Sequence, residues 1–108
     1  MEKILVIEDN KDYQFLIQTS LGKDYRVVIA DTGNSGVDMA KEHRPDLILL
    51  DISLGEVDGF EVCHRLRAQK ETEKTPIIFL SSSFFSGVTA NFVNILPFEG
   101  FFRSFPFA

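Results

Sequence analysis

Four short apolar runs, each followed by a polar residue, constrain the fold of this chain more than any other feature. They cover residues 4–7, 25–30, 47–50 and 76–80, and the first and third stop at Glu8 and Asp51. Short continuous runs rich in valine, isoleucine and leucine are typical of strands buried on both faces of a parallel sheet. The runs therefore predict four strands of such a sheet.

The segments between the runs have the period of amphipathic helices. Asn10 and either Asp31 or Thr32 can cap the first two helices, while Gly22 and Pro45 end their patterns. The alternating order βαβαβαβ predicts an α/β fold, a doubly wound parallel sheet with helices on both faces. The residues expected on the inward helix faces are Tyr13, Leu16, Ile17, Leu21, Val37, Ala40, Phe60, Cys63 and Leu66, with Arg65, Arg67 and Lys70 outside.

Size and charge limit the classes of function. The 108 residues suffice for one small domain. A net charge of −5 argues against general nucleic-acid binding. With Cys63 as the sole cysteine no internal disulfide can form, and the run at residues 4–7 is too short for a signal peptide or membrane span. We therefore expect a cytoplasmic domain with no direct nucleic-acid or membrane partner.

Acidic and hydroxyl side chains follow three of the predicted strands. Glu8 and Asp9 follow the first, Asp51 the third and Ser81 the fourth. The carboxyl ends of parallel strands meet at one edge of the sheet, which is where such sheets bind ligands. Carboxylates gathered there repel one another and need a counter-charge, and a hard cation such as Mg²⁺ supplies it.

This arrangement predicts phosphoryl-transfer chemistry at Asp51. An aspartate beside a divalent cation can act as a nucleophile toward a phosphoryl group. Ser81 can donate a hydrogen bond to a phosphoryl oxygen, although Ser82 or Ser83 would do so in another register. The alternative interpretation is that all these residues cap helices in strand-end turns and face water. Their joint placement at several strand ends favours the functional interpretation.

At these residues the chain resembles the receiver domains of response regulators. The resemblance covers residue 3 to about residue 83 and is carried by ILVIEDN, PDLILLDISLGEVDGFEV and PIIFLSS. The middle block is the most specific, because it places Asp58-Gly59 at the family's spacing after Asp51. The resemblance implies a flavodoxin-like receiver fold with strand order 2-1-3-4-5.

The resemblance also implies roles for the matching residues. Asp51 is implied to be the phosphoacceptor, and Ser81 the switch residue that contacts the phosphoryl group. The side chains of Ser53 and Ser83 are implied to tune the lifetime of the phosphate. The implied partners are a sensor histidine kinase or phosphotransfer protein and an unknown downstream effector. The implied ligands of Mg²⁺ (or Mn²⁺) are Asp9, Glu8, Asp51 and the backbone carbonyl of Ser53.

Residues 84–108 depart from the family pattern. Only Glu99 and Arg103 are charged after Lys74, eight of the eleven phenylalanines lie here, and no helical or strand period is evident. Members of this family carry a Lys-Pro pair after the fifth strand, and the lysine contacts the phosphoryl group. This lysine has no equivalent here, because Arg103 is not followed by proline and the two Pro-Phe pairs follow leucine and phenylalanine. We predict a receiver domain at 1–83, an atypical tail at 84–108 in place of the fifth β-α unit, and no output domain. A truncated or frame-shifted chain is the predicted cause.

Three other reactive side chains are assigned no role in the site. His43 is predicted at a solvated helix end, where the helix dipole favours it. His64 is predicted on the surface, with no cysteine or histidine at metal-ligand spacing. Cys63 is predicted to be a small core residue.

The leading hypothesis is a phosphoacceptor module of a two-component phosphorelay. It is a switch, with no enzyme activity beyond its own phosphorylation and dephosphorylation. The main alternative is a degenerate or truncated receiver that no longer switches, as the missing lysine suggests. A metal-dependent phosphatase is a third hypothesis. It is disfavoured because Ser53 stands where such enzymes carry a second aspartate.

Overall fold

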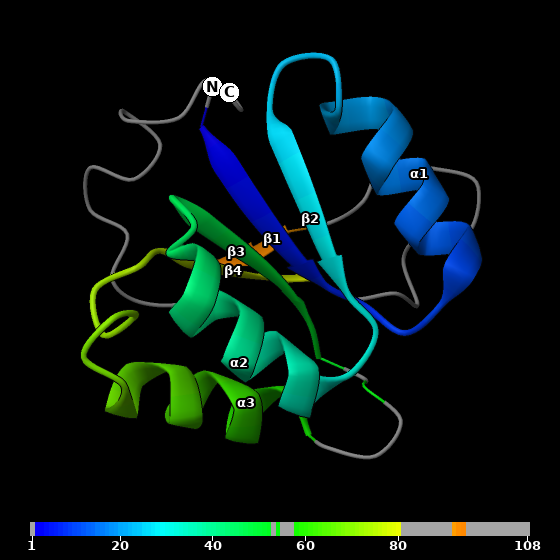
Figure 1. Ribbon diagram of the computed structural model, residues 1–108. Coiled ribbons are helices and arrows are strands. Elements are labelled where there is room, and N and C mark those ends of the chain that lie inside the picture. Colours follow the sequence, from blue (N-terminus) through cyan, green and yellow to red (C-terminus); the bar gives the residue numbers. More distant parts are fainter. Residues whose placement is uncertain (1, 53, 55–57, 81–91, 95–108) are drawn as a thin grey trace.

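A five-stranded sheet with helices on both faces forms the protein. The computed structural model describes residues 2–52, 54, 58–80 and 92–94 (Figure 1). The elements, in chain order, are β1 (Lys3–Ile7), α1 (Lys11–Leu21), β2 (Arg26–Ala30), α2 (Gly33–His43), β3 (Leu47–Asp51), α3 (Gly59–Ala68), β4 (Ile77–Leu80) and β5 (Phe92–Asn94).

The strand order β2-β1-β3-β4-β5 confirms the predicted fold class. The first four strands are parallel and nearly level at their carboxyl ends. Ile7 pairs with Ala30 on one side and with Leu50 on the other, and Asp51 pairs with Leu80. This register brings the polar residues after β1 and β3 to one end of the sheet, here called the carboxyl edge.

Alternate residues of the buried strands serve two separate cores. Leu5, Ile48 and Phe79 pack with residues of α2 and α3, which lie side by side on one face (Figure 1). Val6 and Leu49 pack with Ile17 of α1 on the other face. The continuous apolar runs thus follow from burial of both faces of each strand.

The helices begin at the capping residues that the sequence predicts. The Asn10 side chain accepts a hydrogen bond from the Tyr13 N–H, and Thr32 forms a capping box with Ser35. Helix α2 ends at Arg44, whose φ of 48° places it in the left-handed region just before Pro45.

The predicted inward faces are wrong at two apolar residues. Leu16 is 43% exposed and Phe60 is 54% exposed. Each residue of a helix is turned by about 100° from the one before it. Leu16 is therefore turned away from buried Ile17, while Gln14 takes the inward place. The Phe60 ring instead lies over buried Phe79, with ring centroids 5.0 Å apart.

Arg67, expected outside, is half-buried and holds the segment between α3 and β4. Its Nη1 donates hydrogen bonds to the carbonyl oxygens of Thr72, Glu73 and Thr75, at 3.0, 3.3 and 2.7 Å. Thr72 is fully buried, and its hydroxyl donates to the Leu66 carbonyl. The prediction failed because a long side chain can bury its stem and still satisfy its donors.

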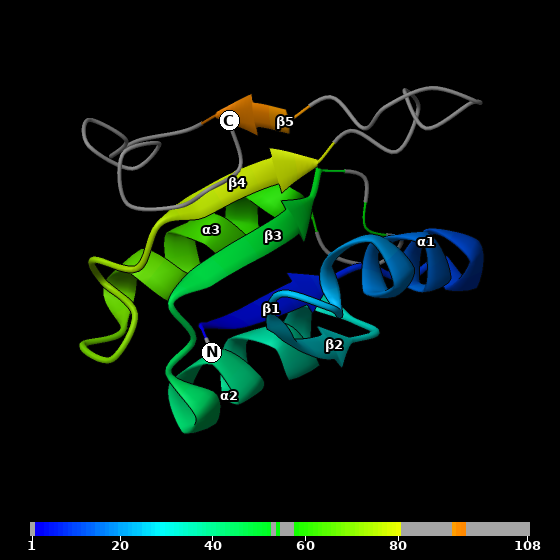
Figure 2. The ribbon, with the colours of Figure 1, turned by 90° about the horizontal axis from the view of Figure 1, so that it is seen from above.

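The last strand runs opposite to the others, which the sequence did not predict. β5 pairs antiparallel with β4, with Phe92 opposite Leu80 and Asn94 opposite Ile78, and Figure 2 shows its arrow reversed. A parallel neighbour needs a long crossover, whereas an antiparallel one needs only a reversal of direction. Either arrangement gives the N–H and C=O groups on the outer edge of β4 a partner.

Candidate metal and phosphoacceptor site

Three carboxylates meet at the carboxyl edge, as the sequence predicts. Oxygen atoms of Glu8, Asp9 and Asp51 all lie within 4.8 Å of one another. Glu8 and Asp51 are buried at 0% and 1% exposure, and Asp9 is exposed. Among these three carboxylates, Asp9 is therefore the one that faces solvent.

Strand register explains why the buried pair is close. Glu8 and Asp51 each come one residue after the paired residues Ile7 and Leu50. Backbone hydrogen bonds hold both strand ends, because the Glu8 N–H donates to Ala30 and the Ile52 N–H donates to Leu80. Both carboxylates thus project from rigid positions.

The surroundings of Glu8 disfavour an ionised carboxylate unless a cation lies beside it. Its Oε2 accepts a hydrogen bond from the Asn10 N–H at 3.0 Å, while Oε1 is buried and, within the part of the chain that the structure describes, accepts none. Burial raises the pKa of Glu8 to about 8, with a further increase from Asp51, although the Asn10 N–H opposes the rise. A buried acceptor without a donor is costly, and a cation would satisfy it.

The spacing of the cluster fits a small divalent ion. Opposite ligands of octahedral Mg²⁺ lie about 4.2 Å apart, because each Mg–O bond is 2.0–2.1 Å. The carboxylate oxygens lie within 4.8 Å of one another, so small side-chain adjustments or intervening waters can complete the coordination. The all-oxygen donor set matches the preference of Mg²⁺ and Mn²⁺.

Gly59 allows the start of α3 to lie against the end of β3. Its N–H donates to the Ile52 carbonyl at 3.1 Å. A Cβ at this position would lie 2.6 Å from the backbone oxygen of Asp51, which is too close for any other residue. Asp58 caps α3 by accepting a hydrogen bond from the Phe60 N–H.

Comparison with known proteins identifies the family of this fold. The family model described as the response regulator receiver domain matches residues 4–92. The chain belongs to the response regulator receiver domain family. Proteins of this family are signalling modules, and the phosphoacceptor role in two-component signalling agrees with the geometry of the acidic cluster.

Transcriptional regulatory proteins are among the curated relatives that match. It is 41% identical over 83 residues to the transcriptional regulatory protein AfsQ1 of Streptomyces coelicolor, covering 76% of this chain and 36% of that protein. It is also 41% identical over 70 residues to the regulatory protein PhoP of Bacillus subtilis, covering 64% and 29%. The chain therefore spans about a third of the length of these curated relatives.

A solved structure carries the expected metal. The receiver domain of the sensor histidine kinase PA1611 from Pseudomonas aeruginosa matches with a TM-score of 0.72 and 34% identity, over 80% of this chain and 71% of that one. It contains a magnesium ion in the active site cleft. A cation site among acidic residues thus occurs in a relative of the same fold.

The sequence analysis did not predict a hydrogen-bonded group, formed by Gln14, Asp31 and Lys11, that contacts the backbone of Glu8. Gln14 is buried on α1, and its Nε2 donates to the Glu8 backbone oxygen and to Asp31 Oδ1, at 2.6 and 2.8 Å. Asp31 also accepts from Lys11 Nζ at 2.9 Å. A polar residue in line with Ile17 on the inward helix face was the available signal, because buried polar groups require partners.

Other predicted site residues lie outside the described residues. These are Ser53, Ser81 and Ser83, together with Arg103 of the tail, so their roles stay predictions. His64 is exposed, His43 is half-buried at the last residue of α2, and Cys63 is half-buried against the core. None of these three belongs to the acidic cluster that the described residues form.

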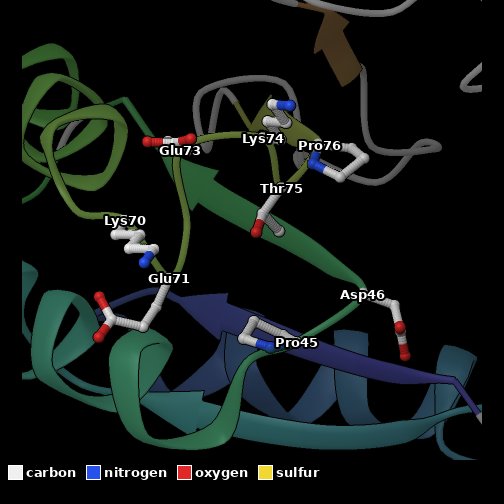
Figure 3. Close-up of a pocket in the computed structure, with 8 residues that line it drawn as sticks. All are labelled: Pro45, Asp46, Lys70, Glu71, Glu73, Lys74, Thr75 and Pro76. Carbon is white, nitrogen blue, oxygen red and sulfur yellow. The ribbon is translucent and has the colours of Figure 1, made fainter.

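A shallow pocket of about 440 Å³ lies at the opposite, amino edge of the sheet (Figure 3). Pro45 and Asp46 before β3 line it, with Thr75 and Pro76 before β4 and the charged residues Lys70, Glu71, Glu73 and Lys74. It is therefore separate from the carboxylates. No helix of the described residues is long and apolar enough to cross a bilayer.

Proposed function

We propose that Asp51 is the phosphoacceptor of this receiver domain and that Glu8 and Asp9 hold the divalent cation that the reaction requires. One observation carries the proposal: a buried carboxylate oxygen of Glu8 finds no hydrogen-bond donor among the described residues and lies beside Asp9 and Asp51. A structural cluster of turn residues would have no reason to bury an unsatisfied acceptor, because its cost is of the order of 1–3 kcal/mol. A cation-binding role accounts for it.

The proposed reaction is transfer of a phosphoryl group to a carboxylate. An Asp51 oxygen attacks phosphorus, the P–N bond of a phosphohistidine donor breaks, and the histidine nitrogen keeps the electron pair and takes up a proton. The product is an acyl phosphate on Asp51. A cation held by Glu8 and Asp9 would neutralise charge on the transferring phosphoryl oxygens. Burial of Asp51 restricts the directions that the attacking oxygen can take.

The cation is proposed to be Mg²⁺, with Mn²⁺ as a substitute. Asp9 is the exposed direct ligand, Glu8 binds directly or through water, and Asp51 contributes one oxygen. The backbone carbonyl of Ser53 is the fourth proposed protein ligand. Ser81 is the proposed phosphoryl-contacting switch residue, and the Ser53 and Ser83 side chains are proposed to tune the lifetime of the phosphate.

The proposed partners follow from this chemistry. A sensor histidine kinase or a phosphotransfer protein supplies the phosphoryl group in the cytoplasm. A downstream effector protein, or a further domain, reads the phosphorylated state. Direct binding to nucleic acid is not part of the proposed role, because the net charge of −5 opposes it.

The decisive experiment is phosphorylation by a small donor. The protein is incubated with acetyl phosphate, with Mg²⁺ or with a chelator, and its intact mass is measured. We expect a Mg²⁺-dependent gain of one phosphoryl group that is absent in Asp51→Asn. Asp58→Asn is the matched control, since it changes a nearby acidic residue that caps a helix. A gain of mass in Asp51→Asn would contradict the proposal.

The antiparallel β5 favours one second candidate, a receiver that binds the cation but no longer switches. A reversed last strand replaces the parallel fifth unit that the family resemblance implies. Beryllofluoride with Mg²⁺ should then perturb NMR signals near Asp51 and leave those of β4 and β5 unchanged. Sustained consumption of many equivalents of acetyl phosphate would instead favour the phosphatase hypothesis.

A further inference from the structure

We propose that Gln14 is a positioning residue for the cation site. Its side chain joins the backbone between Glu8 and Asp9 to the start of the β2–α2 connection through two hydrogen bonds. This inference rests on the proposed function, because it assigns Gln14 a role toward the same carboxylates. Gln14 does not touch the cation or the phosphoryl group itself.

The two contacts fix the orientation of the Gln14 amide. The Glu8 backbone oxygen and the Asp31 carboxylate can only accept hydrogen bonds, so the amide nitrogen must face both. The nitrogen has two hydrogens, and each has one acceptor at 2.6 or 2.8 Å. Gln14 is 8% exposed, so water is a poor replacement for this donor.

The hydrogen bond from Gln14 to the Glu8 carbonyl holds the peptide unit that connects the two proposed metal ligands, Glu8 and Asp9. The Glu8 carbonyl belongs to the peptide unit between Glu8 and Asp9, so its orientation sets where both side chains point. The next peptide carries the Asn10 N–H, which donates to Glu8 Oε2 at 3.0 Å. Gln14 therefore influences the Glu8 carboxylate through the two peptide units that link Glu8 to Asn10.

Asp31 is the second acceptor of the Gln14 amide, and Lys11 in turn pairs with Asp31. Asp31 Oδ1 accepts from Gln14 and from Lys11 Nζ. The hydrogen bond from Lys11, followed by that from Gln14, lowers the pKa of Asp31, so this acceptor stays ionised near neutral pH. The carbonyl of Glu8, the amide of Gln14 and the carboxylate of Asp31 form one continuous chain of hydrogen bonds.

Gln14→Met tests the proposal, because it keeps the length of the side chain and removes both donors. Groups that orient metal ligands typically change metal affinity about 10–100-fold when lost, so we expect Mg²⁺ to bind at least 10-fold more weakly. Gln14→Lys, which retains donors of similar reach, should restore most of the affinity. Mg²⁺ titration followed by NMR measures each value.

Thr72→Val is the matched control for general destabilisation. It removes a buried hydrogen bond to the Leu66 carbonyl at the far end of the sheet. It should lower the melting temperature as Gln14→Met does, yet leave Mg²⁺ affinity unchanged. Equal losses of Mg²⁺ affinity in the two variants would overturn the proposal.

Amide hydrogen exchange at Asn10 separates this proposal from the proposed function. In metal-free protein, Gln14→Met should speed exchange of the Asn10 N–H relative to wild type, while Thr72→Val should not. If wild type binds no Mg²⁺, the proposed function fails while this readout still reports on Gln14. Unchanged exchange at Asn10 in Gln14→Met would refute the positioning role.

Discussion

Buried polar groups are hydrogen-bonded at one end of the sheet and incompletely hydrogen-bonded at the other. At the amino edge, Arg67 and Thr72 satisfy their donors and four backbone carbonyls through hydrogen bonds. At the carboxyl edge, fully buried Glu8 has one oxygen to which no described residue donates, and its pKa is raised to about 8. The difference indicates that the amino edge stabilises the fold, whereas the carboxyl edge carries a buried acceptor that lowers stability, as is typical of functional sites.

The largest expected effect is a pH dependence that comes from the carboxyl edge. The pKa of Glu8 is raised from 4.5 to about 8 in the folded state, so the folded protein binds more protons than the unfolded chain between these values. Stability therefore falls as pH rises through this window. At about 1.4 kcal/mol for each pKa unit, metal-free protein should lose about 3–5 kcal/mol.

Urea denaturation at a series of pH values, in the presence of a chelator, measures this loss. The same series with Mg²⁺ should show a smaller loss, because the cation replaces the proton on Glu8. A free energy of unfolding that is constant from pH 5 to pH 8 in metal-free protein would show that Glu8 is not held as described.

The next largest effect belongs to the amino edge. Arg67→Met keeps much of the stem but leaves the carbonyls of Thr72, Glu73 and Thr75 without their common donor. We expect a loss of about 2–3 kcal/mol, independent of pH between 5 and 8 and of Mg²⁺. Denaturation under the same conditions tests it. A loss that Mg²⁺ reverses would mean that the two edges are coupled.

Glu8→Gln should separate stability from metal binding. It removes the buried charge while keeping the shape, so at pH 8 the metal-free variant should be more stable than wild type by about 2 kcal/mol. Its Mg²⁺ affinity should fall, because one carboxylate ligand is lost. Thermal denaturation and Mg²⁺ titration measure the two changes, and Glu61→Gln on the exposed side of α3 is the neutral control.

The smallest expected effect is at the surface of the carboxyl edge. The Lys11 and Asp31 side chains are 75% and 61% exposed, although they pair at 2.9 Å. Exposed ion pairs contribute about 0–1 kcal/mol, so Lys11→Met should change the free energy of unfolding by less than 1 kcal/mol. A Mg²⁺ affinity reduced as far as in Gln14→Met would assign the positioning role to the ion pair instead.

Much of the fold and site follows from local patterns in the sequence. Both faces of the central strands are buried, so their apolar runs are unbroken, and the capping side chains of Asn10, Thr32 and Asp58 mark the helix starts. Level parallel strands then bring Glu8 and Asp51 together, whatever the details of packing. The carboxylate cluster was predictable because it depends on strand ends alone.

The features that the sequence did not reveal depend on contacts between distant elements. Gln14 and Arg67 are polar residues whose burial is decided by acceptors elsewhere, and neither acceptor set can be read from a helical period. Leu16 and Phe60 are apolar but lie at the margins of their helix faces. The direction of β5 depends on how the chain reaches the edge of β4, which no short pattern specifies.

The reversed last strand also changes the route of the polypeptide. In a sheet whose strands all point the same way, each strand carries the chain to the end where Asp51 lies. β5 instead carries it away, since Phe92 stands beside Leu80 and Asn94 beside Ile78. The peptide bond after Asn94 thus begins at the end remote from the acidic residues. A change at Asp51 can therefore reach β5 sideways, across β4, which pairs with both β3 and β5.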